Sequence, residues 1–120
     1  MIVQRLKAPV DDKYEKAERY YMILSAVNDL KLTPREIQLM AFTAIRGNMS
    51  YATIREDFCN KFKSTSPTIN NIISKLKKIG VLIKKDGKIK VNPVILLDFD
   101  KDVQLDIKLI GKKDDEGQTT

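Results

Sequence analysis

Lysine is the residue type whose number and spacing point most clearly to a chemistry in this chain. Residues 61–90 carry nine lysines and a single acidic residue, Asp86, which gives this stretch a net charge of +8. The whole chain of 120 residues has a net charge of +6, so the other residues sum to −2. Positive charge gathered on one segment is typical of a surface that binds a polyanion.

A second group of candidate residues lies on a helix predicted over residues 67–79. Isoleucine and leucine recur at helical spacing on one face of this helix, up to Ile79, and we expect that face to be buried. Ser66 and Pro67 are the expected N-cap and first helical residue, and Gly80 suits the left-handed position after the helix. The outer face then carries side chains that can hydrogen-bond to base edges or phosphates. These candidates are Ser66, Thr68, Asn70, Asn71, Ser74 and Lys75.

A β-hairpin is predicted directly after this helix. Residues 81–84 and 88–91 are rich in apolar β-branched side chains, and Asp86-Gly87 between them is a strong hairpin signal. The hairpin carries lysines that suit contact with a phosphate backbone better than base reading, because an ammonium group is a point charge. These lysines are Lys84, Lys85, Lys88 and Lys90.

The rest of the composition predicts a protein that is not an enzyme and holds no metal or other cofactor. The chain has no histidine, which removes the commonest general base and the histidine-activated nucleophiles. With only Cys59 and no histidine, it also lacks the ligands of a structural zinc site. A lone cysteine forms no internal disulfide, and we expect a cytoplasmic protein. No run of about 18 apolar residues is present, so we expect no membrane contact.

Two helices that precede the lysine-rich unit have clear boundary signals. Residues 12–31 are the first, with Asp12 as a cap and apolar side chains at spacings of three and four up to Val27. The segment Thr33–Glu36 predicts the start of the second helix, with a threonine N-cap, a proline first residue and a glutamate that completes a capping box. Gly47 is expected to end it.

A third helix is predicted over about residues 51–61, with Ile54 and Phe58 on its buried face. Met49 and Ser50 are expected to form a short strand or turn before it, with Ser50 as the N-cap of the helix.

The C-terminal part is predicted to be a β extension. Residues 94–99 and 103–110 have the composition of strands, and the second alternates apolar and polar side chains. A short helix over 93–97, capped by Asn92, is the alternative for the first of these. Residues 111–120 are a polar tail. An exposed strand at 103–110 would offer an edge for a homo-oligomer or another protein assembly.

The stretch SPTINNIISKLKKIGVLIKKDGKIKV, within residues 33–93, resembles the winged helix-turn-helix superfamily, including MarR-like regulators and phage or plasmid replication initiators. The resemblance implies a three-helix core with a hairpin wing, in which the helix at 66–79 enters the major groove of double-stranded DNA and the hairpin touches the backbone. The expected organisation is an N-terminal arm and helix over 1–32, the winged domain over 33–93, a strand extension over 94–110 and a tail over 111–120.

Two functions fit these expectations. The first is a DNA-binding protein, either a transcriptional regulator or a replication accessory factor, with modest specificity that leans towards A·T-containing sites because the recognition helix has no arginine. The second is a structural or interaction module, such as a phage virion or connector component, that uses the same fold for protein–protein contacts. Such a component would reside in the virion.

Overall fold

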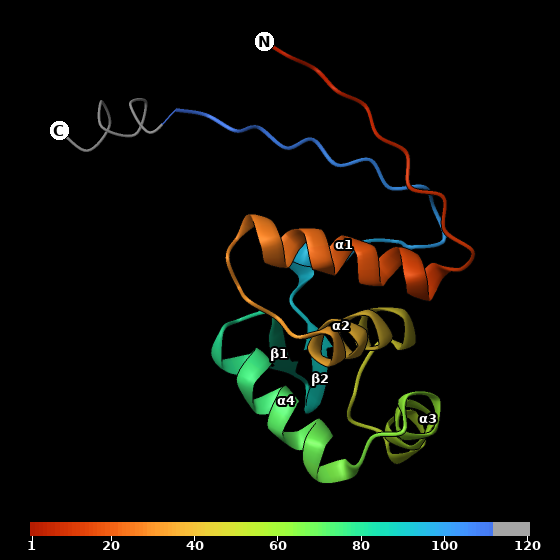
Figure 1. Cartoon of the computed structure of the whole chain (residues 1–120). Coiled ribbons are helices and arrows are strands. Elements are labelled where there is room, and N and C mark those ends of the chain that lie inside the picture. Colours follow the sequence, from red (N-terminus) through yellow and green to blue (C-terminus); the bar gives the residue numbers. More distant parts are fainter. Residues whose placement is uncertain (112–120) are drawn as a thin grey trace, which may run out of the picture.

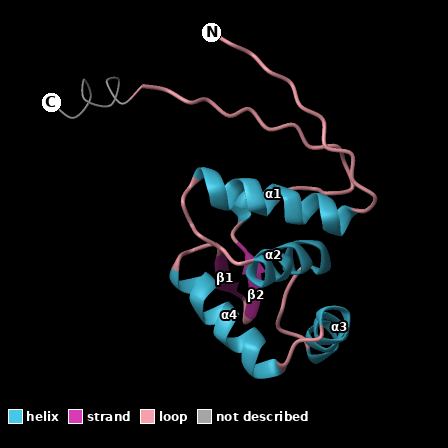
Figure 2. Ribbon diagram, in the orientation of Figure 1, coloured by secondary structure: helices cyan, strands magenta, loops and turns pink. Residues whose placement is uncertain are grey.

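The computed structural model describes residues 1–111, and all but the first residue of the predicted tail (111–120) lie outside them. The described chain is α+β, with four helices and one two-stranded antiparallel sheet (Figures 1 and 2). In chain order the elements are α1 (Lys13–Val27), α2 (Pro34–Arg46), α3 (Ala52–Phe62), α4 (Ser66–Lys78), β1 (Leu82–Lys85), β2 (Lys88–Val91) and a 3-10 turn (Pro93–Ile95). The predicted order of an extra N-terminal helix, three helices and a hairpin is confirmed.

The first two helices begin where their capping residues predict. The Asp12 carboxylate accepts a hydrogen bond from the Glu15 amide at 2.8 Å. At the start of α2, the Thr33 hydroxyl accepts from the Glu36 amide at 3.3 Å, and the Glu36 carboxylate accepts from the Thr33 amide at 2.8 Å. This reciprocal pair satisfies two amides that the helix itself cannot satisfy. α2 ends at Gly47, whose φ of 94° suits a residue without a β-carbon.

The predicted cap of the third helix is wrong. Tyr51 is the N-cap of α3, and the Ser50 hydroxyl instead accepts a hydrogen bond from the Ile89 amide at 2.7 Å. The Met49 amide donates to the Ile89 carbonyl at 2.9 Å. Residues 49 and 50 therefore lie along the outer edge of β2, which ties the start of α3 to the hairpin.

The core is built around α2, which lies between α1 and the hairpin (Figure 1). Its apolar side chains Leu39, Met40 and Phe42 are buried, and the Phe42 ring packs edge-on against Phe58 of α3 at a centroid distance of 5.5 Å. Tyr21 of α1 is also buried and donates a hydrogen bond from its hydroxyl to the Ile95 carbonyl at 2.9 Å. Helix α1 is thus packed on both α2 and the segment after the hairpin.

Two residues predicted on buried faces are exposed. Val27 is the last residue of α1, which ends before the predicted residue 31. Ile79 is the C-cap of α4, one position beyond the last helical residue. Both residues stand at the C-terminal end of their helix, and their side chains are exposed by 57% and 42%.

The predicted C-terminal β extension is wrong. Within residues 1–111 the strands are β1 and β2 alone, and Figure 2 shows residues 96–111 as loop. Asn92 caps a 3-10 turn at Pro93–Ile95 by accepting from the Val94 amide at 3.1 Å, as the alternative prediction had it. Phe99 is buried beside the Tyr21 ring. Residues 103–110 are extended but pair with no strand of the described chain, because no free strand edge lies beside them.

Candidate nucleic-acid interface

Helix α4 separates its side chains into a buried apolar face and an exposed polar face, as the sequence predicts. Ile69, Ile72, Ile73 and Leu76 are buried against the core. All six candidate side chains of the outer face are exposed. They are Ser66, Thr68, Asn70, Asn71, Ser74 and Lys75. The packing of the isoleucines holds the polar face in a fixed orientation towards solvent.

The N-terminal end of α4 differs from the prediction by one residue. Thr65, not Ser66, is the N-cap, and its hydroxyl accepts from the Thr68 amide at 3.4 Å and lies 2.9 Å from the Thr68 hydroxyl. Ser66 and Pro67 occupy the first turn, where amides have no partner within the helix and a proline is tolerated. Ser66 therefore presents an exposed hydroxyl that is not used for capping.

An arginine from α3 lies against the polar face of α4, and sequence reasoning missed it. The Arg55 guanidinium donates from Nε to the Met49 carbonyl at 2.9 Å and from Nη1 to the Asn70 Oδ1 at 2.7 Å. The amide group of Asn70 is thereby oriented by a neighbouring helix. The only signal in the sequence is that Arg55 is the last arginine of the chain, in the helix directly before α4.

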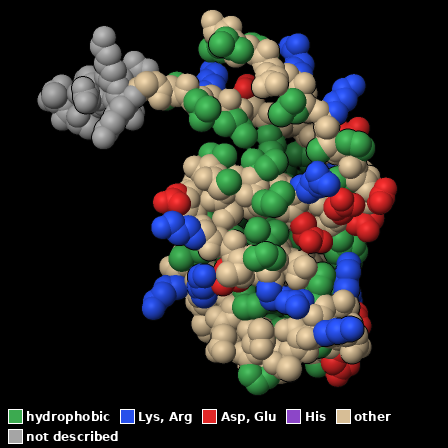
Figure 3. Space-filling view, in the orientation of Figure 1, with side chains coloured by type: hydrophobic (Ala, Val, Ile, Leu, Met, Phe, Trp, Pro, Cys, Tyr) green, Lys and Arg blue, Asp and Glu red, His purple; other side chains and the backbone are tan. Residues whose placement is uncertain are grey.

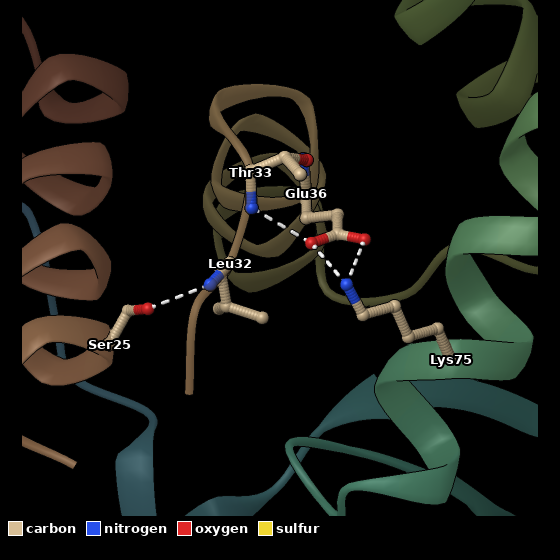
Figure 4. Close-up of polar contacts among 5 residues, drawn as sticks. All are labelled: Ser25, Leu32, Thr33, Glu36 and Lys75. Atoms are coloured by element: carbon tan, nitrogen blue, oxygen red, sulfur yellow. Dashed lines mark hydrogen bonds and ion pairs between the residues drawn. The ribbon is translucent and has the colours of Figure 1, made fainter. Parts of the chain in front are cut away.

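The charge of Lys75 is engaged within the protein. Its Nζ lies 2.9 Å from Oε2 and 3.0 Å from Oε1 of Glu36, at the start of α2 (Figure 4). Burial disfavours ionisation of the Glu36 carboxyl, but hydrogen bonds from Thr33 and Lys75 outweigh it and lower the pKa. Leu32 beside it donates its amide to the Ser25 hydroxyl of α1 at 3.0 Å. Lys75 therefore joins α4 to α2 through Glu36, and its contact with DNA stays a prediction.

The hairpin divides its four candidate lysines between two faces. Asp86 and Gly87 have φ values of 54° and 76°, as the predicted two-residue turn requires. Lys85 pairs with Lys88 across the strands, and Lys90 pairs with Ile83 on the same outer face. Lys84 pairs with the buried Ile89 and so shares the inner face, although its own side chain is exposed near the turn.

The outer face of the hairpin adjoins the start of α3. The Nζ of Lys88 lies 5.4 Å from the ring centroid of Tyr51, an exposed aromatic side chain at the N-cap of α3. A lysine over a tyrosine ring is attracted by the negative face of the π system. This contact directs Lys88 towards α3 and places an aromatic side chain beside the outer lysines.

The positive side chains do not form one continuous patch on the face that Figure 3 shows. Lys and Arg lie at several separate places across the half of the molecule that holds α3, α4 and the hairpin. Acidic side chains gather at the level of α1. On this face, Lys and Arg also lie in the half that holds α1 and the terminal segments, so the positive charge is not confined to the helix–hairpin unit.

Comparisons with known proteins give no family for this chain, since no family model, curated protein or solved structure matches it. None of the helices in residues 1–111 has the length and apolar character needed to span a bilayer. The same residues contain no group of three histidine, cysteine, aspartate or glutamate side chains placed to hold a metal ion.

Proposed function

We propose that the protein binds double-stranded DNA as a winged helix-turn-helix protein, with α4 in the major groove and the outer lysines of the hairpin along the phosphate backbone. The observation that carries the proposal is the exposed face of α4. Small hydrogen-bonding side chains cover it, and four buried apolar residues lock it in place from behind. A major groove accepts one α-helix, whose N-terminal half meets the base edges.

The connection between α4 and the hairpin supports the proposal. Gly80 has a φ of 87° and turns the chain directly from the helix into β1. The Asn92 side chain donates to the Gly80 carbonyl at 3.0 Å, which holds the end of β2 against the same turn. Helix and hairpin are therefore joined at this turn, so contacts made by the hairpin lysines would also position α4 on a duplex.

Asn70 is the best candidate for reading a base. An asparagine amide pairs with both N6 and N7 of adenine, which agrees with the proposed preference for A·T-containing sites. Arg55 already donates to its Oδ1, so the amide is oriented before DNA arrives and its Nδ2 is left for the adenine N7. A carbonyl oxygen accepts two hydrogen bonds, so the contact with Arg55 is compatible with the contact to adenine.

Charge reversal on the hairpin tests the backbone contacts. Lys85→Glu and Lys88→Glu are expected to weaken binding to every duplex sequence alike, because phosphate contacts carry no sequence information. Lys101→Glu is the matched control, since its side chain is exposed outside the helix–hairpin unit. Fluorescence anisotropy with a labelled duplex measures all three. Equal affinity for the wild type and both hairpin variants would contradict the proposal.

Removal of the Asn70 amide tests base reading. Asn70→Ala is expected to relax the preference at one base position by about 1–3 kcal/mol and to leave the other positions unchanged. Selection of preferred sequences from a random duplex pool, repeated with the wild type and the variant, measures this. An unchanged preferred sequence would rule out base reading by Asn70.

The alternative function is a structural or interaction module that uses this fold without DNA. The observation that favours it is the extended segment 103–110, which exposes apolar side chains. Measuring the binding of the wild type to labelled duplexes at several salt concentrations distinguishes the two functions. Wild-type protein that shows no salt-dependent binding to any duplex would support the module.

A further inference from the structure

Residues 103–110 are an extended segment with the features of a strand that lacks a partner. None of their backbone amides or carbonyls makes a hydrogen bond within residues 1–111. The apolar side chains alternate with polar ones, and Leu105, Ile107 and Leu109 are exposed by 39%, 48% and 95%. An unpaired strand of this kind is a template for pairing with another chain.

The residues directly before this segment are held against α1. The Lys16 ammonium donates to the Lys101 carbonyl at 3.0 Å and lies 3.8 Å from an oxygen of Asp102. Lys13 lies 3.8 Å from an oxygen of Asp100 in the same turn. The segment therefore leaves the body from a fixed point, so less conformational freedom is lost when it pairs with a partner.

We propose that a second copy of this chain is the partner, and that residues 104–110 of the two copies pair as antiparallel strands around a two-fold axis through Ile107. The sequence Leu105-Asp106-Ile107-Lys108-Leu109 is self-complementary in this register. Ile107 lies opposite Ile107 of the other copy, Asp106 lies opposite Lys108 on each side of the axis, and Leu105 lies opposite Leu109.

Charge complementarity favours this register over the parallel pair and over the axes one residue away. A parallel pair in register would set Asp106 against Asp106 and Lys108 against Lys108, and like charges directly opposite destabilise a sheet. Moving the antiparallel axis to Asp106 or Lys108 again places like charges together. An axis between two residues sets apolar side chains opposite charged ones. Among axes at residues 106, 107 and 108, the one at Ile107 sets Asp106 opposite Lys108 and apolar side chains opposite one another within residues 105–109, and Gln104 then lies opposite Ile110.

The location of the segment makes this contact independent of the proposed DNA interface. The two terminal segments of the described chain run on the α1 side of the molecule, away from α3 and α4 (Figure 1). A two-fold pair of strands at this side leaves both copies of α4 exposed. Two-fold dimers use the same surface patch on both subunits, as this register does.

Single charge reversals test the register. Asp106→Lys and Lys108→Asp each create two like-charge pairs across the axis, and each is expected to weaken self-association about tenfold. The double variant restores complementarity in reversed order and is expected to dimerise like the wild type. A mixture of the two single variants is expected to form the heterodimer. Sedimentation equilibrium over micromolar to millimolar concentrations measures each state.

The same measurement can overturn the proposal. A wild-type chain that stays monomeric at millimolar concentration, or single variants that associate as tightly as the wild type, would show that this pairing does not occur. Because Lys85 and Lys88 take no part in it, Lys85→Glu is expected to leave the dimer unchanged even where it weakens DNA binding.

Cross-linking gives an independent readout of the axis. In a Cys59→Ser background, Ile107→Cys places two thiols directly opposite each other, at a separation that a disulfide spans. Asp106→Cys is the control, because its counterpart across the axis is Lys108. Mild oxidation is expected to give covalent dimers with the first variant and monomers with the second. Equal yields from the two variants would contradict the register.

Discussion

The segment from α4 to β2 and the segment from 94 to 110 have equally regular sequences, yet only the first forms the predicted elements. The isoleucines of α4 pack against other helices of the same chain, and β1 pairs with β2 across a two-residue turn. Residues 103–110 alternate just as clearly but are not paired within residues 1–111. Alternation therefore predicts which side chains share a face, and it does not supply the neighbouring strand.

The two segments differ in whether the structure that each strand or helix pairs with lies close by in the sequence. The hairpin brings its second strand with it, because Asp86-Gly87 turns the chain back on itself. A helix needs only its own backbone to satisfy its hydrogen bonds. A lone strand leaves its amides and carbonyls to water until a second strand pairs with it, and no neighbouring segment within residues 1–111 of the same chain supplies that strand.

The largest expected effect is on the free energy of unfolding, when an isoleucine is replaced by alanine in each of the two segments. Ile69 is fully buried in α4, and Ile69→Ala is expected to lower the free energy of unfolding by about 2–5 kcal/mol through lost burial and a residual cavity. Ile107→Ala, in the extended segment, is expected to change it by less than about 0.5 kcal/mol. Urea denaturation at low protein concentration measures both. Similar losses in the free energy of unfolding for the two variants would contradict this difference between the two segments.

Glu36→Gln tests how far polar contacts hold α4 in place. Glutamine keeps an oxygen for the Thr33 amide but loses the charged contact with Lys75, so we expect a loss of about 1.5–3 kcal/mol at neutral pH. Glu15→Gln is the control, because its pair with Arg19 at 3.3 Å is exposed and is expected to contribute less than about 1 kcal/mol. Equal effects of the two variants would assign no special role to the Glu36 contact.

The pH dependence of the same variant has a definite sign. The pKa of Glu36 lies below its ordinary value of 4.5 in the folded chain, so the unfolded chain binds more protons in acid. The stabilisation is therefore present above pH 4.5 and is lost as the pH falls through the folded pKa. The difference between wild type and Glu36→Gln is expected to shrink in acid, as thermal unfolding at several pH values would show. A difference that grows in acid would contradict this assignment.

The smallest expected effect concerns the start of α4. Thr65→Ala removes the hydroxyl that caps the helix and is expected to cost about 1 kcal/mol of stability. Ser66→Ala, one residue later, removes an exposed hydroxyl and is expected to change stability by only a few tenths of a kcal/mol. Denaturant titration of the two variants decides between the observed cap and the predicted one.

Local signals predicted most of the fold, and tertiary contacts account for most of what they missed. Caps, prolines and glycines gave the order and approximate ends of all four helices and the hairpin. The caps at Ser50 and Ser66 were wrong, because neighbouring Tyr51 and Thr65 take those positions and Ser50 bonds to β2 instead. A choice between adjacent residues depends on contacts with distant parts of the chain.

For the candidate site as well, local patterns predicted which residues are exposed but not which contacts they make with other helices. Helical spacing identified the exposed residues of α4, and strand pairing accounts for three lysines on one face of the hairpin. The contacts of Arg55 with Asn70 and of Lys75 with Glu36 join different helices, so no local pattern encodes them. Both contacts fix the orientation of α4.

The salt dependence of duplex binding tests the DNA-binding proposal most directly. Binding through phosphate contacts predicts that log affinity falls linearly with log salt, with a slope of about −0.9 per contact. Removal of two contacts in the Lys85→Gln, Lys88→Gln double variant is expected to make this slope about 1.8 less negative. A wild-type affinity that does not change with salt, or a double variant with an unaltered slope, would contradict the proposal that this helix and hairpin bind DNA.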